Sequence, residues 1–263
     1  MPSYIEKIEE LSLPVVALRG TVAFPAMTVN FEPPDEEATQ AVQAAASGNA
    51  YLFLTSYDEL CAEDEPFPYY RVGTVAKIKQ MLRTPEGKTR IITEGNARAT
   101  VTRYRKSGTH VEADLLCKRI QLPDCGGVRG EAYVHELLAA LEKSAAFLPT
   151  STDDLMNAAR LINDPAVLSD FIASNIFVRD RDKQAVLECF DPFRRAETTL
   201  EILASEASIM AEEAIIRRRD EGGWETLQES LPNGDTMHAF IRQLATNPVT
   251  GRTALVVVVL TVM

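Results

Sequence analysis

Residues 13–27 read LPVVALRGTVAFPAM, and this stretch sets the pattern for the first half of the chain. Its first six residues form a short apolar run that Arg19-Gly20 ends, and Phe24-Pro25 turns the chain again. An apolar run of this length, closed by turn residues, is typical of a buried strand. We therefore predict that the chain opens with a β-rich structure.

The same rhythm of apolar runs and turn residues continues to about residue 122. Further strands are predicted over residues 51–55, 71–82, 88–94, 97–104 and 111–115. Gly95, between two of these runs, predicts a bulge or bend. One helix is predicted over residues 35–47, because acidic residues favour its start and Gly48-Asn49 ends it. Residues 1–122 are thus predicted to form a β-rich domain.

Residues 123–127, PDCGG, break this rhythm, and the spacing of apolar residues changes from two to about 3.6. Val134, Leu137 and Leu141 mark one face of a first helix. Further helices are predicted to start at capping sequences, namely residues 151–154 (STDD), Asp164-Pro165 and Asp191-Pro192. We predict a helical bundle over residues 128–221 that ends in a long helix, and an α+β fold class for the chain. Residues 222–263 form a divergent tail for which the pattern predicts no single structure.

The long helix that opens at Asp191-Pro192 carries a narrow apolar seam, with residues at alternating steps of three and four. Leu200, Leu203 and Met210 belong to this seam. Two interpretations remain open. The seam packs against the helix's own bundle, which the pattern alone favours, or it projects as an arm through which chains self-associate.

The composition is that of an ordinary soluble globular protein, with 46% hydrophobic and 25% charged residues. The net charge of −11 argues against nucleic acid as a partner, because phosphate contacts need clustered Lys and Arg. The first residues are polar and acidic, so no signal peptide is predicted. The apolar run 254–263 is about half the length that crosses a bilayer. We expect a cytoplasmic protein with no membrane partner.

No group of residues predicts a metal, a cofactor or a catalytic centre. Cys61, Cys117, Cys125 and Cys189 contain no CxxC pair and the three histidines are scattered, so free thiols in a reducing compartment are expected. Gly87-Lys88-Thr89 lacks both the preceding glycine and the following helix of a phosphate loop. No GxSxG sequence occurs, and no Ser, His and acid group suggests a triad. We therefore predict no cofactor and no catalytic residue.

Apolar and aromatic side chains in turn-rich segments are the best candidates for a contact surface. Exposed aromatic and Met side chains suit the binding of unfolded polypeptides, because flexible apolar groups fit many sequences. The candidates are Phe24, Met27, Phe31, Phe67 and Tyr69. The alternative, that most of these side chains pack into the β core, is left open.

Four motifs, in order along the chain, resemble the N-terminal region of Lon-type ATP-dependent proteases. They are residues 13–27, VGTVA at 72–76, EGNARA at 94–99, and the pair LSDFIAS at 168–174 and KQAVLE at 183–188. The resemblance covers residues 13–190, with a compatible long helix to about residue 221. It implies a β-rich, PUA-like LON subdomain followed by a helical bundle.

In Lon proteases this region recognises unfolded or tagged polypeptides and supports a hexameric assembly, while a following AAA+ module and a Ser-Lys dyad consume ATP and cut the substrate. Neither a Walker A sequence nor a matching protease segment is present here, so we expect a non-catalytic recognition module. Its expected partners are unfolded or damaged polypeptides, together with a second copy through the long helix. Two alternatives are a truncated or partial Lon protease, which is an ATP-dependent serine endopeptidase, and a stand-alone LON-domain regulatory protein.

Overall fold

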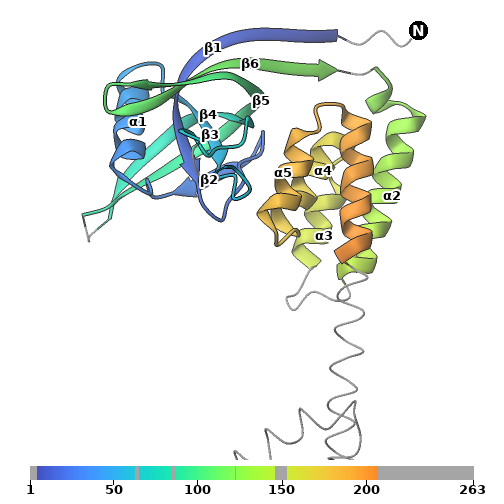
Figure 1. Ribbon diagram of the computed structural model, residues 1–263. Helices are drawn as coiled ribbons and strands as arrows, with labels where there is room; N and C mark the ends of the chain where they lie inside the picture. Colours follow the sequence, from blue (N-terminus) through green and yellow to red (C-terminus); the bar gives the residue numbers. More distant parts are fainter. Residues whose placement is uncertain (1–4, 63–64, 85–86, 122, 146–152, 207–263) are drawn as a thin grey trace, which may run out of the picture. The chain divides into compact units, whose positions relative to one another are not determined.

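The computed structural model describes residues 5–62, 65–84, 87–121, 123–145 and 153–206. A mixed sheet with one helix is followed by a helical part (Figure 1). The strands are β1 (Ile5–Leu18), β2 (Thr28–Phe31), β3 (Tyr51–Ser56), β4 (Val72–Arg83), β5 (Thr89–Ser107) and β6 (His110–Gln121). The helices are α1 (Glu36–Ser47), the short 3-10 helix η1 (Pro123–Gly126), α2 (Val128–Ala145), α3 (Asp153–Arg160), α4 (Pro165–Asn175), α5 (Asp180–Glu188) and a further helix over residues 192–206. The α+β class predicted from the sequence is confirmed.

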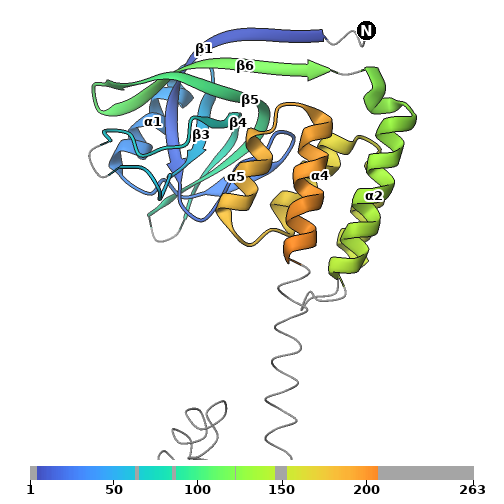
Figure 2. The ribbon, with the colours of Figure 1, turned by 45° about the vertical axis from the view of Figure 1, so that its right-hand side comes forward.

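The strands form one sheet in the order β2-β5-β4-β3-β1-β6, and a further pairing of β5 with β6 closes the sheet on itself. β1 and β3 are parallel, whereas the other pairings of named strands are antiparallel. β5 allows the closure because it is long enough to pair with β2 at residues 91–94 and with β6 at residues 99–107. The long antiparallel pair of β1 and β6 lies side by side in both views (Figures 1 and 2).

A bulge in β5 lies at the position that Gly95 predicts. Ala76 pairs with Gly95 and Val75 pairs with Ala97, so one residue of β5 is left without a partner in β4. The N–H of Gly95 donates a 2.9 Å hydrogen bond to the carbonyl of Met27. The segment that precedes β2 is thereby held directly against the bulge.

Helix α1 packs on the sheet through small side chains. Its N-cap, Asp35, accepts a 2.7 Å hydrogen bond from the backbone N–H of Ala38, as the acidic start of the segment predicts. Three of its four buried residues are alanines, and they share a core cluster with Leu52 and Leu54 of β3. Small side chains on this face allow the helix to lie close to the strands.

The helices that follow β6 lie side by side in both views and share one apolar core (Figures 1 and 2). Asp164 caps α4 by accepting a 2.8 Å hydrogen bond from the N–H of Ala166. Asp191 caps the helix over residues 192–206 by accepting a 2.9 Å hydrogen bond from the N–H of Phe193. Both Asp-Pro helix starts are therefore confirmed, whereas residues 151 and 152 of the STDD sequence lie outside the described residues.

The β-rich part and the helical part share a core. Phe24 belongs to the same buried cluster as the helical residues. The side-chain amide of Gln184 in α5 donates a 3.0 Å hydrogen bond to the carbonyl of Val72 in β4. Arg98 of β5 forms a buried ion pair with Asp170 of α4. The predicted boundary near residue 122 thus separates the strands from the helices in sequence, although the two parts pack against each other. The predicted tail over residues 222–263 lies outside the described residues.

Candidate functional site

The loop between β3 and β4 carries aromatic side chains at the surface of the β-rich part. Tyr57 and Tyr69, at its two ends, form an antiparallel bridge. The N–H of Asp58 donates a 2.9 Å hydrogen bond to the carbonyl of Pro68. These contacts close the loop at its base and fix the direction in which its rings point.

Four rings, which we call the aromatic cluster, meet at this loop: Tyr57, Phe67, Tyr69 and, from β5, Tyr104. The ring centroids lie 5.2 Å apart for Tyr57 and Tyr69, and 5.6 Å apart for Phe67 and Tyr104. The hydroxyl of Tyr104 donates a 2.7 Å hydrogen bond to the carbonyl of Tyr70. Edge-to-face and tilted rings at such separations attract one another, so the aromatic cluster is a fixed surface of half-buried rings.

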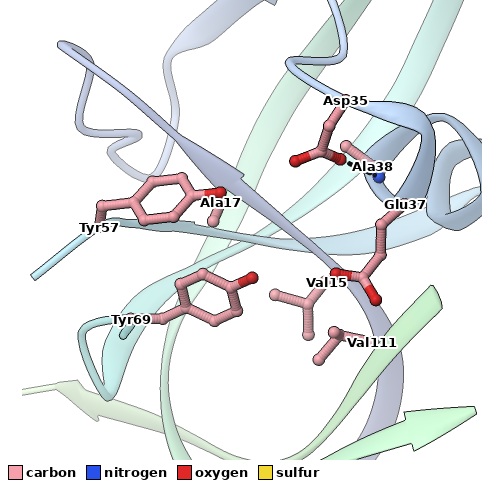
Figure 3. Close-up of a pocket in the computed structure, with 8 residues that line it drawn as sticks. All are labelled: Val15, Ala17, Asp35, Glu37, Ala38, Tyr57, Tyr69 and Val111. Carbon is pink, nitrogen blue, oxygen red and sulfur yellow. Dashed lines mark hydrogen bonds between the residues drawn. The ribbon is translucent and has the colours of Figure 1, made fainter. Parts of the chain in front are cut away.

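A shallow hollow with a cavity volume of about 10 Å³, open to solvent, lies between the aromatic cluster and the start of α1 (Figure 3). Apolar side chains of β1 and β6 form one wall. Figure 3 shows the hydroxyls of Tyr57 and Tyr69 and the carboxylates of Asp35 and Glu37 pointing toward the same space. Small-molecule sites usually measure roughly 300–1,000 Å³. With room for about one water molecule, this pocket is too small to enclose a cofactor.

Burial raises the pKa of two phenols in the aromatic cluster, those of Tyr69 and Tyr104. Burial, and after it the charges of Tyr57 and Glu37, raises the pKa of Tyr69 above its ordinary value. Burial likewise raises the pKa of Tyr104. Both hydroxyls are thus hydrogen-bond donors throughout the physiological pH range.

An alkaline titration of the chain is expected to show that these two phenols ionise at a higher pH than exposed tyrosines. An acid whose pKa is raised in the folded state stabilises the fold below its ordinary pKa, and this stability is lost as the pH rises past that value. Tyr69→Phe should therefore reduce the rise in phenolate absorbance at the highest pH values. The free energy of unfolding should also decrease less steeply with pH in alkaline solution. The measurements are ultraviolet absorbance and denaturant midpoints against pH. An unchanged late phase in a Tyr69→Phe/Tyr104→Phe double variant would contradict this.

The structure separates the five predicted contact residues. Phe67 and Tyr69 lie together in the aromatic cluster. Met27 and Phe31 are half-buried elsewhere, Met27 against the helical core and Phe31 against the cluster beneath α1. Phe24 is 1% exposed, which corrects its prediction as a contact residue: its side chain fills the core that the sheet and the helices share.

The apolar seam of the helix over residues 192–206 faces its own bundle as far as the structure describes it. Leu203 is 1% exposed, and Leu200 packs partly buried against the same core. Burial leaves Leu203 unavailable to a second copy of the chain, so the interpretation as an arm does not apply to this residue. Met210 lies outside the described residues.

Two exposed apolar side chains near the end of β4 were missed by the sequence reasoning. Met81 and Leu82 are 41% and 40% exposed. They lie beyond Lys77, where the pairing of β4 with β3 ends, in a hairpin arm that β4 forms with β5. The sequence feature that could have identified them is the lack of apolar-polar alternation over residues 79–83. These residues are exposed on both faces of the strand. An edge strand of this kind is a candidate surface for an extended polypeptide.

Two kinds of feature are absent from the described residues. Among them, no group of three or more His, Cys, Asp or Glu side chains is placed to hold a metal ion. Within the same ranges, no helix has the length and apolar character needed to cross a membrane. The aromatic cluster, its pocket and the hairpin arm supply apolar contact, hydrogen-bond donors and carboxylates.

The fold is that of a Lon N-terminal domain. It resembles the solved N-terminal domain of the Mycobacterium avium complex Lon protease with a TM-score of 0.52 and 23% identity, over 75% of this chain and 98% of that chain. The family model of the ATP-dependent protease La (LON) substrate-binding domain matches residues 12–205. The chain therefore belongs to the LON substrate-binding domain family, and the resemblance of its motifs is confirmed.

Two relatives illustrate how much of a Lon protease this chain corresponds to. The Lon protease of Azorhizobium caulinodans is 31% identical over 237 residues, which are 89% of this chain and 27% of that protein. The Lon protease of Escherichia coli strain K12 is 28% identical over 241 residues, which are 91% of this chain and 30% of that protein. The chain spans about a quarter to a third of the length of these relatives.

Proposed function

We propose that the chain is the polypeptide-recognition part of a Lon-type ATP-dependent protease, and that it binds unfolded or damaged chains without cutting them. The observation that carries this proposal is the match of residues 12–205 to the family of LON substrate-binding domains. The half-buried aromatic cluster supports it, because rings that are fixed in place bind apolar segments with little loss of conformational entropy.

The contact surface in this proposal consists of Phe67, Tyr69 and the neighbouring Leu60, which is 77% exposed, together with Met81 and Leu82 of the hairpin arm. Apolar contact of this kind contributes about 25 cal/mol per Å² of buried area, and the ordering of a flexible client opposes it. Weak and broad binding is the expected outcome.

The proposal includes the compartment and the partners. A net charge of −11 disfavours nucleic acid, and the free thiols of Cys61 and Cys189 suit a reducing, cytoplasmic compartment. Self-association through the long helix is part of the proposal only for residues beyond the buried Leu203, such as Met210.

Binding of fluorescent unfolded casein, compared with a folded protein of similar size, tests the proposal. The chain should bind the unfolded form preferentially and leave it uncut when ATP is present. Leu60→Ser should weaken binding about five-fold, because losing one apolar contact costs on the order of 1 kcal/mol. Leu161→Ser is the matched control, since Leu161 is 82% exposed but lies after α3 in the helical part.

Equal affinity for folded and unfolded protein would contradict the recognition role. Hydrolysis of casein by this chain alone would contradict the absence of catalysis. An equal loss of binding in Leu60→Ser and Leu161→Ser would mean that the loop between β3 and β4 is not part of the contact surface.

A further inference from the structure

The hairpin arm leaves one edge of the sheet open. The pairing of β3 with β4 ends at Tyr51 and Lys77, whereas β4 continues beside β5 as far as Arg83. A bulge at Lys79 follows, so the regular part of this edge comprises residues 80–83, all of them exposed. Within the described part of the chain, these residues have a strand partner on one side only. The N–H and C=O groups on the other side of such a strand can bond to a further strand.

A second open edge belongs to the first half of β1. This strand pairs with β6 from Ile5 onward, but its pairing with β3 begins only at Val15. Figures 1 and 2 show this half of β1 along the outside of β6. Ile8, Glu9 and Glu10 are exposed. Among the described strands, the first half of β1 is therefore also paired on one side only, over a length greater than that of the open edge of β4.

The two edges carry opposite charge. Residues 77–90 contain five basic residues and one acidic residue, in a chain whose net charge is −11. Residues 5–12 contain three acidic residues and one basic residue. Like charges on neighbouring strands repel and opposite charges attract, so each edge matches the other edge and not itself. Three of the basic residues are in ion pairs at the surface, which contribute little in water: Lys79, Lys88 and Arg90.

Apolar side chains accompany the charges on both edges. Because side chains alternate between the two faces of a strand, Met81 and Arg83 share one face of the arm, and Leu82 lies on the other. In the same way, Ile8 and Glu10 share one face of β1. Met81, Leu82 and Ile8 are 41%, 40% and 54% exposed. Each edge thus offers a charged and an apolar side chain on the same face, which are the groups that stabilise cross-strand pairs.

We propose that the acidic edge of β1 in one copy of the chain pairs as a strand with the basic edge of β4 in a second copy. The hairpin arm and the start of β1 lie on opposite sides of the β-rich part in Figure 1, so a chain does not pair its own two edges. A contact between unlike edges is head-to-tail, and it closes a ring or continues from copy to copy. This contact does not depend on the proposed recognition role. It covers Met81 and Leu82, so a second copy and a bound polypeptide exclude each other at the arm.

Sedimentation velocity of the full chain over a range of concentrations tests the proposal. The chain should form species larger than a monomer, and these should dissociate at high salt because exposed charges are screened. Arg83→Glu and Glu10→Lys should each weaken the association about five-fold, since each turns an attractive contact into a repulsive one. An equimolar mixture of the two variants should associate again, because their reversed edges match each other. Arg194→Glu makes the same charge change at an exposed position of the helical part, and this control should associate like the unmodified chain.

Amide hydrogen exchange distinguishes strand pairing from contact between charges alone. The N–H groups of residues 8–12 and 80–83 should exchange more slowly as the concentration of the chain rises. A chain that stays monomeric, or a mixture that associates no better than either variant alone, would overturn the proposal. Association without slower exchange at both edges would do the same. If Arg83→Glu weakens the binding of unfolded casein in a chain that is monomeric throughout, the arm binds a polypeptide client, and a second copy is not its partner.

Discussion

Replacing Asp170 with asparagine is expected to destabilise the fold by about 3–5 kcal/mol, the usual cost of removing one partner from a buried ion pair. Asp170 is 4% exposed and forms ion pairs with two buried arginines, Arg98 of β5 and Arg195 of the helix over residues 192–206. Without its charge, two buried guanidinium groups lose the carboxylate with which each of them forms an ion pair. Chemical denaturation of the full chain measures the loss.

The direction of this effect follows from how the arginines are placed. Burial lowers the pKa of Arg195 to about 10, and the neighbouring charge of Asp170 acts in the opposite direction. Backbone carbonyls at the end of α5 accept further hydrogen bonds, from Arg98 at Leu187 (3.0 Å) and from Arg195 at Cys189 (2.9 Å). Carbonyl dipoles stabilise the excess positive charge only in part, because they carry no net charge themselves.

Asp114→Asn is the matched control, because Asp114 also pairs with an arginine but at the surface, where the two side chains are 36% and 43% exposed. Water replaces the lost partner there, so the denaturation midpoint of this variant should be close to that of the unmodified chain. Should Asp170→Asn behave like Asp114→Asn, the buried network would not be what holds α4 against β5.

The parts of the fold that local sequence could predict are those with a local cause. The Asp-Pro helix starts, the helix after Asp35 and the bulge at Gly95 each depend on a few neighbouring residues, and the structure has all of them. The strand β2 was missed, because its four residues follow turn signals and carry too little apolar pattern to be recognised. The first half of β1 was missed for a related reason, since it is polar and pairs at the sheet edge with β6.

The candidate site depends on contacts between distant residues, which periodicity does not report. Phe67 and Tyr69 were identified as candidates, but their neighbour Tyr104 lies in another strand, and only the closure of the sheet brings it to the loop. The pair of Arg98 with Asp170 joins positions 72 residues apart. Phe24 was predicted as a contact residue but is buried. An apolar residue beside a proline gives no local sign that other parts of the fold will cover it.

Replacing Gly95 with alanine is expected to destabilise the chain by about 3 kcal/mol or more, at the upper end of the effects of overpacking. A Cβ at this position would lie 2.2 Å from the carbonyl oxygen of Phe24 and 3.1 Å from the Cα of Pro25. Both atoms belong to backbone, so no side-chain rotation relieves the collision. The segment is also bound to Gly95 by two hydrogen bonds, to Met27 O (2.9 Å) and from Ala26 N–H (2.8 Å), so it cannot withdraw without breaking them.

Gly126→Ala separates this steric cause from the general effect of a glycine substitution. Nothing lies within 4 Å of a Cβ built at Gly126, so that variant should have a near-normal denaturation midpoint. Because Phe24 fills the core shared with the helices, the collision at Gly95 should also loosen the helical part, visible as faster amide exchange around Leu168 and Ile172. A midpoint for Gly95→Ala equal to that of Gly126→Ala would mean that the Phe24 segment can move away at little cost, and that the glycine of the EGNARA motif is not required by this close approach.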